Sequence, residues 1–376
     1  MKILHTGDWH LCSPMDSKLT TEKAKQRRDE LRSRFADMIR YAEENGVDAV
    51  LLCGDLSDDG ILPHELQDYL LSLIENAADI RFFLVSGNHD PMTSASRGGC
   101  FSHGRRVLPQ NLHIFEGAWE TCMLDGGVTV SGTVLPQEMC EAEVPLFAAD
   151  CFNIVMLHGQ ITDSGSRFGG EEYLIPLPAF RDRNIDYLAL GHEHRFRHKR
   201  LDDRCTWCYA GCPEGRGFDE CGPRGFVVLT VADGCARGAE FVPFAARILH
   251  DLQLDISDLA PDTFATEQAL AVLVSQISPR DLVRITLVGT DAANCDRGLS
   301  YLRRRLAERF FYAELCDLRR CAVNMDALCA DVSLRGEFVR QVLACETLSE
   351  EDRAEILRLG LAALSGEEGT RDENGL

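Results

Sequence analysis

The stretch that decides the fold is RFFLVSGNHD, residues 81–90, an apolar run that ends in three polar side chains. The apolar half is typical of a buried strand, and a turn accounts for Gly87 and Asn88. A turn needs neither His89 nor Asp90 behind it. If the same pattern recurs elsewhere in the chain, it indicates a site rather than a connection.

The pattern occurs five times. Side chains with oxygen or imidazole groups follow apolar strand-like segments at Asp8 and His10, at Asp55, at Asn88, His89 and Asp90, at His158, and at His192 and His194. Loops at the carboxyl ends of strands gather at one edge of an α/β sheet and form its binding site. We therefore expect these side chains to meet at one place.

Imidazoles and carboxylates at this density require a cation, because carboxylates in close proximity repel each other and neutral imidazoles offer lone pairs. The set contains nitrogen and oxygen atoms and no thiolate, which suits manganese, iron or zinc in five- or six-coordinate sites. Seven ligands are too many for one ion and fit two ions with a bridging carboxylate. Two ions about 3.5–4 Å apart clamp the attacking and leaving oxygens of a phosphate displacement.

The chain has 376 residues, of which 45% are hydrophobic and 26% charged, as in an ordinary soluble globular protein. This length favours one large and one smaller domain. No apolar run approaches the ~18 residues of a membrane span. The N-terminal stretch MKILHTGDWH lacks the apolar centre of a signal peptide, so a cytoplasmic protein is expected.

The net charge of −21, from 39 Lys and Arg against 60 Asp and Glu, argues against tight DNA binding by the chain alone. It leaves room for a local basic surface. The most basic stretch, HRFRHKR, begins at an expected metal ligand and contains Arg195 and Arg197; Arg97 and Arg105 follow the GNHD stretch. These four are candidates for contacts with a nucleic-acid backbone. Solvated surface charge is the alternative for each.

Sixteen cysteines are scattered through the chain, which favours reduced thiols in the absence of a signal peptide. The densest group is Cys205, Cys208, Cys212 and Cys221, for which a structural zinc ion is an alternative. The segment TWCY is predicted to be a strand. An odd separation then places Cys205 and Cys208 on opposite faces, which argues against zinc.

Alternating strand-like and helix-like segments predict a layered α/β domain over residues 1–245, with helices near 23–44 and 63–78. Residues 246–333 are predicted to form a small βαβαβ domain. Residues 334–365 are predicted to form a pair of short helices, and residues 366–376 a disordered tail.

The five polar blocks resemble the pattern of the calcineurin-like metallophosphoesterase superfamily. They are Asp8-Trp9-His10, Gly54-Asp55, Gly87-Asn88-His89-Asp90, His158 and Gly191-His192-Glu193-His194. Within it the chain is similar to SbcD-type DNA repair exonucleases, most of all their YhaO-type branch, through GDWHL (7–11), GRGFDE (215–220) and GEFVR (336–340). The resemblance implies a layered metallophosphoesterase β-sandwich flanked by helices, with a small α+β capping domain and C-terminal helices.

The resemblance also implies roles for the site residues. Asp8, His10, Asp55 and His194 would hold one ion; Asp55, Asn88, His158 and His192 would hold the other, with Asp55 bridging. His89 would stand over the scissile phosphate and protonate the leaving 3′ oxygen, and Asp90 would orient His89 by accepting a hydrogen bond from its ring. Mn²⁺ is the expected metal, with Fe²⁺ and Zn²⁺ as alternatives.

The activity implied is that of a two-metal phosphodiesterase that cleaves DNA, with a metal-bridging water as nucleophile, in an SbcCD-like repair complex. The C-terminal helices are expected to dock on an SbcC-like ABC/SMC-type ATPase. The side chains that suggest docking are Phe338, Val339, Val342, Leu357 and Leu364. Packing of these side chains onto the protein's own core is the alternative. A homodimer is left open.

Two other functions remain as alternatives. The negative charge favours a phosphodiesterase or phosphatase that acts on a small phosphate ester. A regulatory adaptor of an ABC-type ATPase is the other, and the complete ligand set speaks against it. Many relatives carry His or Asp three residues after the expected bridging Asp55, and here that residue is Asp58, as in bacterial forms. Several relatives have Ser where this chain has Cys212. These departures leave strand polarity and the balance of exonuclease and endonuclease activity open.

Overall fold

The computed structural model describes residues 1–15, 18–91, 99–101, 107–134, 139–140, 144–163, 167–168, 173–292, 295–321, 325–345 and 348–365. The chain folds into two compact units. The first comprises Met1–Asp251, Ser278–Arg284 and Phe310–Tyr312, and the second comprises Leu252–Ile277, Ile285–Arg309 and Ala313–Leu376.

Two six-stranded sheets form the first unit. The order of the first sheet is β16-β15-β1-β2-β3-β4, and that of the second is β13-β14-β12-β8-β6-β5. The first sheet contains β1 (Lys2–Thr6), β2 (Ala49–Cys53), β3 (Arg81–Val85), β4 (Leu112–Ile114), β15 (Gly225–Ala232) and β16 (Cys235–Pro243). The second contains β5 (Glu120–Met123), β6 (Val128–Gly132), β8 (Phe152–His158), β12 (Tyr187–Gly191), β13 (Arg197–Arg200) and β14 (Thr206–Tyr209).

The pairing within the sheets is mostly parallel. Strands β1 to β4 are parallel neighbours, and β15 pairs antiparallel with β1. Strands β6, β8, β12 and β14 are also parallel, whereas β5 and β13 are antiparallel edges. The remaining short strands are β7 (Met139–Cys140), β9 (Gln160–Thr162), β10 (Arg167–Phe168), β11 (Leu174–Pro176), β19 (Thr290–Asp291) and β21 (Arg320–Cys321). Three short 3₁₀ segments are Gly99–Phe101, Asp125–Gly127 and Leu177–Phe180.

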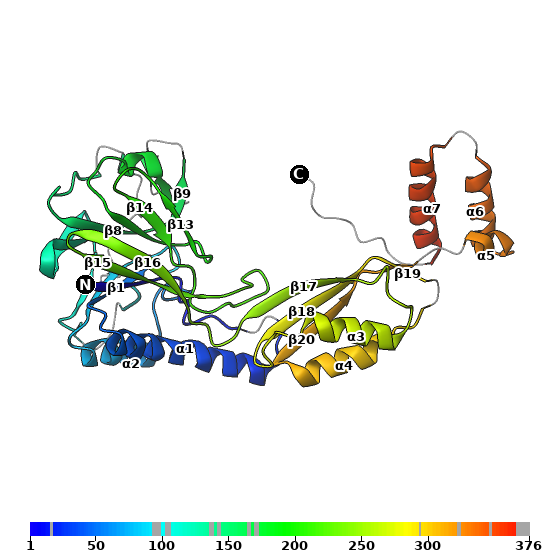
Figure 1. Ribbon diagram of the computed structural model, residues 1–376, viewed down its shortest axis with the longest axis horizontal. Helices are drawn as coiled ribbons and strands as arrows, with labels where there is room; N and C mark the ends of the chain where they lie inside the picture. Colours follow the sequence, from blue (N-terminus) through cyan, green and yellow to red (C-terminus); the bar gives the residue numbers. More distant parts are fainter. Residues whose placement is uncertain are drawn as a thin grey trace. The chain divides into compact units, whose positions relative to one another are not determined.

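The central strands of the first sheet, β1, β2 and β3, are buried on both faces, whereas the edge strand β16 is largely exposed. On β2, Leu51 and Cys53 pack with the second sheet, whereas Val50 and Leu52 pack with the helices. The helices are α1 (Thr21–Glu44) and α2 (His64–Asn76), which lie on the same face of the sheet (Figure 1). Alternate strand residues point to opposite faces, so a strand between two apolar layers is apolar throughout. The layered arrangement predicted from the sequence is confirmed.

Helix α1 begins where the Thr20 side chain accepts a hydrogen bond from the backbone N–H of Lys23, a local cap for an otherwise unpaired amide. Its fully buried face includes Leu31, Phe35 and Met38, spaced three or four residues apart. The start is two residues earlier than the apolar spacing predicted. Capping explains the difference, since the first turn needs no buried side chain.

The five predicted loops come from two sheets. Strands β1, β2 and β3 of the first sheet lead into the loops with Asp8, Asp55 and Asn88. Strand β8 of the second sheet ends at His158, and β12 ends one residue before His192. The apolar core between the two sheets therefore positions one half of the predicted ligands relative to the other half.

The cysteines near β14 lie on opposite faces, as their odd separation predicted. Cys208 is part of the core between the sheets, and Cys205 belongs to the apolar cluster on the outer face of the second sheet. Both are free thiols. Within the described residues, the groups that could hold a metal contain Asp and His.

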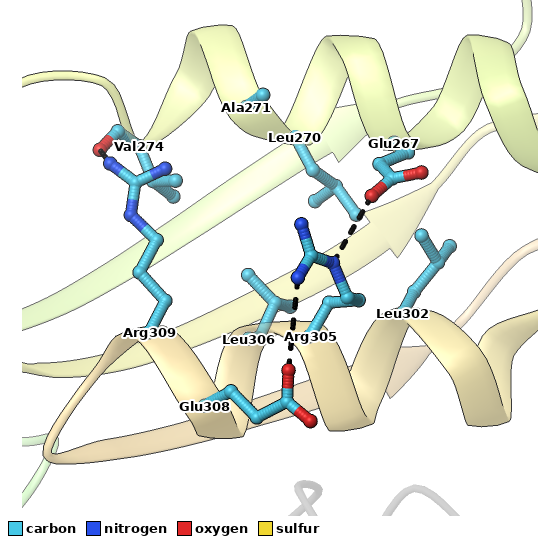
Figure 2. A pocket seen from close by; sticks show the side chains of 9 residues that line it. All are labelled: Glu267, Leu270, Ala271, Val274, Leu302, Arg305, Leu306, Glu308 and Arg309. Carbon is cyan, nitrogen blue, oxygen red and sulfur yellow. Dashed lines mark hydrogen bonds and ion pairs between the residues drawn. The ribbon is translucent and has the colours of Figure 1, made fainter.

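The second unit contains the predicted βαβαβ order. The elements are β17 (Leu249–Asp255), α3 (Thr263–Leu273), β18 (Leu282–Val288), α4 (Leu299–Arg309) and β20 (Tyr312–Asp317), with the sheet order β17-β18-β20. The first residues of the three strands, 249–251, 282–284 and 312, are counted with the first unit. A groove of about 320 Å³ lies between α3 and α4 (Figure 2). Leu270, Leu302 and Leu306 line it, and Arg305 forms ion pairs with Glu267 and Glu308 beside it.

Three helices end the described chain: α5 (Met325–Ala330), α6 (Leu334–Ala344) and α7 (Glu350–Ser365). Val339 and Val342 of α6 pack against Leu357 and Leu361 of α7 in a small apolar cluster. The predicted helical pair is present. The predicted tail, residues 366–376, lies outside the described residues. No helix in the described part of the chain is long and apolar enough to span a membrane.

A buried histidine on β1 joins the two sheets. His5 is fully buried, with Nδ1 3.0 Å from the hydroxyl of Tyr187 and Nε2 3.2 Å from the carbonyl oxygen of Leu190, both on β12. Burial lowers the pKa of His5 from 6.5 to about 3, although the Leu190 carbonyl acts in the opposite direction. His5 is therefore neutral in the folded protein at pH values where the unfolded chain takes up a proton.

This difference predicts a loss of stability in mild acid. Because the unfolded state binds the proton first, the contribution of His5 to the free energy of unfolding falls as pH drops below 6.5. Between about pH 7 and about pH 5 the loss is about 2 kcal/mol. Urea unfolding of the wild type and of His5→Gln at both pH values isolates this effect. An equal pH dependence in the two proteins would contradict the assignment.

Candidate metal centre

One group of potential ligands comprises Asp8, His10 and His194, whose ligand atoms all lie within 4.8 Å of one another. The Nε2 atoms of His10 and His194 are 3.4 Å apart. Two atoms bound to one ion at ordinary bond lengths lie about 3–3.5 Å apart, so this spacing fits a shared cation. Asp8 Oδ2 is buried without a hydrogen-bond partner, which also fits a metal ligand.

A second group lies beside the first. The side-chain oxygen of Asn88 is 2.9 Å from His158 Nε2 and 3.0 Å from His192 Nδ1. Asp55 Oδ2 is 3.3 Å from the same His158 nitrogen. These four side chains thus direct one oxygen or nitrogen atom each toward a common point, and they are the four predicted for the second ion.

Asp55 lies between the two groups. Its Oδ2 atom, 3.3 Å from His158 Nε2, is also 3.8 Å from His10 Nε2. The ligand atoms of Asp8, Asp55 and His158 also lie within 4.8 Å of one another, so the two groups are contiguous. A bridging carboxylate at Asp55 is compatible with these distances.

A polar partner outside the predicted ligands lies beside Nδ1 of His10, His158 and His194. Nδ1 of His192 faces Asn88 instead. Nδ1 of His158 lies 2.9 Å from the carbonyl oxygen of Cys53 and donates its proton there, which leaves the Nε2 lone pair for a metal. Nδ1 of His194 lies 2.7 Å from Glu220 Oε1 and 3.0 Å from Arg216 Nη2. A proton on Nδ1 shared with the nearer carboxylate leaves the Nε2 lone pair for a metal here too. Nδ1 of His10 lies 3.1 Å from Asp58 Oδ1. Such partners orient metal-binding imidazoles and raise their basicity.

The electrostatics of the cluster favour a cation. Burial raises the pKa of the Asp55 carboxyl, but the nearby His158 outweighs burial, so the net pKa lies below the usual range. Burial lowers the pKa of His158, yet the Asp55 and Asp8 carboxylates raise it to about 9. A site that raises a buried imidazole's pKa stabilises positive charge, as a divalent-metal site must.

The backbone is strained where the ligands are held. Asp8, His10, Asp55 and His192 have positive φ angles of 54°, 46°, 50° and 107°, in a region that residues other than glycine rarely adopt. Strain of this kind costs about 1–3 kcal/mol per residue and gathers at functional sites. All four are predicted metal ligands, so four of the seven predicted ligands lie in turns of this kind.

Two of the glycines that precede ligands are required by close packing. A Cβ atom on Gly87 would overlap Asp55 Oδ1, and one on Gly191 would overlap the carbonyl oxygen of Cys53. The strand ends approach each other too closely for any side chain at these positions. The Gly-before-ligand pattern in the sequence therefore reflects the density of the cluster.

His89 lies at the edge of the cluster, with its ring centroid 5.1 Å from that of His10. Its backbone N–H donates to Asp55 Oδ1 at 2.9 Å, and its Nδ1 is 3.2 Å from the carbonyl oxygen of Asp58. The side chain is exposed, whereas all seven predicted metal ligands are at least half-buried. Its position beside the ligands and open to solvent fits the role expected of a proton donor.

The expected hydrogen bond between the His89 ring and Asp90 differs from the observed arrangement. Asp90 is buried, and its oxygens accept backbone N–H groups of Gly87, Asp55, Leu56 and Ser57 at 2.7–3.3 Å. A buried carboxylate that accepts several amides joins the β2 and β3 loops. The Asp58 carbonyl occupies the place beside the His89 ring instead. Asp90 thus positions the backbone that carries Asp55 and His89.

Two of the four candidate nucleic-acid contacts lie at the site. Arg195 and Arg197 line a hollow of about 470 Å³ together with His192 and His194. Arg197 also forms an ion pair with Glu193 at 3.0 Å. Arg97 and Arg105 lie outside the described residues.

Sequence reasoning gave no role to Glu220, Arg216 or Arg224, which surround His194. Glu220 and Arg216 belong to the GRGFDE stretch that supported the family resemblance. Arg224 is buried and donates to the carbonyl oxygens of Glu220, His194 and Cys221. The available signal was the position of a motif shortly after the last metal loop, but a motif alone does not show which side chain faces a ligand.

Residues 1–196 match the family of calcineurin-like phosphoesterases. The chain belongs to this family. The mixed α/β layers of the first unit agree with that membership, and the family together with the two ligand groups implies two divalent metal ions. The predicted superfamily is therefore confirmed, whereas the YhaO-type branch stays a prediction.

Two curated relatives are similar at low identity. The SbcD component of the nuclease SbcCD of Escherichia coli is 24% identical over 279 residues, which cover 64% of this chain and 67% of the relative. DNA double-strand break repair protein Mre11 of Methanosarcina acetivorans is 24% identical over 247 residues, covering 62% of this chain and 37% of the relative. A solved dimetal phosphatase from Danio rerio aligns at 12% identity with a TM-score of 0.40, covering 64% of this chain and 96% of that one.

Removal of the Asp55 carboxylate charge is expected to weaken both metal sites. Asp55→Asn should lower the Mn²⁺ stoichiometry measured by isothermal titration calorimetry from two ions to one or none at micromolar metal, because Asp55 Oδ2 faces both groups. Asp59→Asn is the matched control, since Asp59 is an exposed carboxylate in the same loop. Two ions bound with unchanged affinity by Asp55→Asn would exclude a bridging role.

Proposed function

We propose that this phosphoesterase is a two-metal phosphodiesterase that cleaves DNA and acts as the nuclease component of an SbcCD-like complex. The observation that carries the proposal is a complete set of two contiguous ligand groups with an exposed histidine beside them. The names of the bacterial and archaeal relatives, one a nuclease component and the other a double-strand break repair protein, support DNA as the substrate.

The two ions, when bound, would supply Lewis-acid stabilisation of the phosphate and activation of a water molecule. Asp8, His10 and His194 would hold one and Asn88, His158 and His192 the other, with Asp55 between them. We expect Mn²⁺ as the metal, since imidazole and carboxylate ligands without thiolates suit it.

His89 would act on the leaving group. Its Nδ1 faces the Asp58 carbonyl at 3.2 Å, so Nδ1 carries the proton of the neutral ring, and Nε2 takes up and releases the second one. Because Nδ1 faces the Asp58 carbonyl, Nε2 is the ring nitrogen left for solvent and substrate. The backbone amide of His89 donates to Asp55. General acid catalysis by His89 to the departing 3′ oxygen would thus proceed from a ring whose orientation the β2 loop sets.

The basic edge strand β13 provides a path for a phosphate backbone. It continues from His194, and its four residues, Arg197 to Arg200, are all exposed. With Arg195 they place positive charge next to the hollow at the metal site, on a chain of net charge −21.

Phosphate contacts make binding salt-dependent. An unchanged salt dependence of DNA binding after Arg195→Ala combined with Arg197→Ala would exclude this path.

We propose that the C-terminal helices dock on an SbcC-like ABC/SMC-type ATPase. Such a partner would supply basic surface for DNA in addition to that of β13. Val339, Val342 and Leu357 pack against one another, so they are occupied within the helical pair. Leu364 remains partly exposed, and Leu334 and Leu359 are 71% and 54% exposed. Exposed leucines on a small helical unit are the kind of surface that a partner helix covers.

The nuclease proposal predicts Mn²⁺-dependent loss of end-labelled linear duplex or single-stranded DNA. His89→Ala should reduce kcat by ~100-fold or more, the usual contribution of a general acid, without loss of bound metal. His64→Ala is the control, because His64 begins α2 on the surface. Gel assays give the rate and the polarity of the products, and calorimetry gives the metal content.

Two outcomes would contradict the nuclease proposal. Hydrolysis of a small chromogenic phosphodiester without DNA cleavage, in the presence of the ATPase, would indicate a small phosphate ester as substrate. Retention of full DNA cleavage by His89→Ala would remove the proposed role of His89. The net charge of −21 is the observation that keeps the small ester as the second candidate.

The docking proposal predicts that truncation after Leu334 abolishes co-purification with the SbcC-like ATPase, because α6 and α7 are then lost. The phosphodiesterase activity of the truncated chain on a small ester should be unchanged, since every metal ligand lies in the first unit. A truncation after Ser365, which keeps both helices, is the matched control. Intact ATPase binding by the shorter chain would exclude docking through these helices.

A further inference from the structure

Glu220 is a buried carboxylate with one oxygen directed at a predicted metal ligand. It is 5% exposed, and Oε1 accepts the Nδ1 proton of His194 at 2.7 Å. Its other oxygen accepts the backbone N–H of Arg216 at 2.7 Å and lies 3.7 Å from the thiol of Cys212. Burial raises the pKa of Cys212 well above its usual value, so the thiol stays protonated and acts as a donor.

Arg216 connects Glu220 to the other histidine of the same group. Its Nη2 donates to Glu220 Oε1 at 2.7 Å, and its Nη1 is 3.5 Å from Asp58 Oδ1. Asp58 Oδ1 in turn lies 3.1 Å from Nδ1 of His10. A series of side-chain contacts thus connects His194 through Glu220, Arg216 and Asp58 to His10. Both histidines at the ends of this series are predicted ligands of the first group.

The loop that carries these residues is fastened at both ends. Near its start, Glu214 forms a buried ion pair with Arg27 of α1 at 2.6 Å. At its end, the guanidinium of Arg224 donates to the backbone carbonyls of Glu220 and His194. The Glu220 carboxylate therefore has little freedom to leave His194.

We propose that Glu220 is a positioning residue of the first metal group, and that Arg216 couples it through Asp58 to His10. This inference rests on the proposed two-metal site and deepens it. Glu220 holds the Nδ1 proton of His194, so Nε2 keeps its lone pair for a cation shared with His10 Nε2, 3.4 Å away. Arg216 balances the two outer carboxylates, which keeps them from competing with Asp8 and Asp55 for a cation.

A purely structural role is the rival explanation, because a buried carboxylate that accepts several hydrogen bonds also stabilises its loop. Glu214 provides the matched control. It is a glutamate of the same loop, 1% exposed and paired with an arginine, and its oxygens contact Arg27, Ala246 and Arg247 rather than a ligand histidine. Both roles predict a lower Tm, but only a positioning role predicts a selective effect on one metal site.

The test measures Mn²⁺ binding to the full-length protein by calorimetry and by electron paramagnetic resonance of free Mn²⁺. Glu220→Ala is expected to weaken one of the two sites by 10–100-fold, the usual effect of removing such a partner, and to leave the other unchanged. Glu220→Gln, which keeps an acceptor oxygen, should recover part of this loss. Glu214→Ala and Glu214→Gln should lower Tm and leave both affinities unchanged.

Kinetics with a small phosphodiester give a second readout. For Glu220→Ala, kcat should fall at limiting Mn²⁺ and recover at excess Mn²⁺, with KM for the ester unchanged. If Glu220→Ala binds both Mn²⁺ ions with wild-type affinity, the proposal is overturned. Equal weakening of both sites would overturn it as well. If Glu220→Ala does not fold, the comparison of Glu220→Gln with Glu214→Gln decides in the same way.

The outcome is separable from that of the nuclease proposal. Metal affinity is measured without DNA, so a wild-type protein that binds two Mn²⁺ ions and leaves DNA intact would contradict the nuclease while the role of Glu220 stands. Unchanged metal binding in Glu220→Ala, together with DNA cleavage by the wild type, would contradict only the role of Glu220.

Discussion

The structure depends on one electrostatic constraint, the confinement of two buried carboxylates among four imidazoles. Asp8 and Asp55 are 2% and 1% exposed, and Asp55 Oδ2 lies within 4 Å of both His10 and His158. Such a cluster repels itself unless cations or protons balance it. This confinement has three consequences. The pKa of His158 is raised, the pKa of Asp55 is lowered, and one oxygen of Asp8 is buried without a hydrogen-bond partner.

The fold meets this constraint by rigid packing of two sheets. Each sheet delivers strand ends to the cluster, and the apolar core between the sheets determines the distance between the two sets of ligands. Close packing at the cluster then requires glycine at positions 87 and 191, and four of the predicted ligand residues have positive φ angles. The strain and the missing side chains reduce stability locally, and the sandwich and its helices offset this loss.

Partners outside the predicted ligand set lie beside three of the four imidazoles. A backbone carbonyl holds His158, a buried glutamate holds His194, and Asp58 lies beside His10. Asp90 has a related function for the backbone, because its carboxylate joins the β2 and β3 loops through four amides. It was expected beside the ring of His89, and the sequence offered no means to distinguish the two arrangements. Adjacent positions in GNHD suggest a direct contact, whereas turn geometry directs Asp90 inward.

The sequence by itself determined which side chains are candidate ligands, their order along the chain, the helices α1 and α2 and the βαβαβ order of the second unit. These features depend on local properties, namely apolar periodicity, caps and polar residues at strand ends. Only the tertiary structure decided that the predicted ligands come from two sheets, that the Cys53 carbonyl lies beside His158, and that Glu220 lies behind His194. The reason is physical: the partner that orients His158 is the Cys53 carbonyl, 105 residues away, and contacts across such separations are made by packing between sheets.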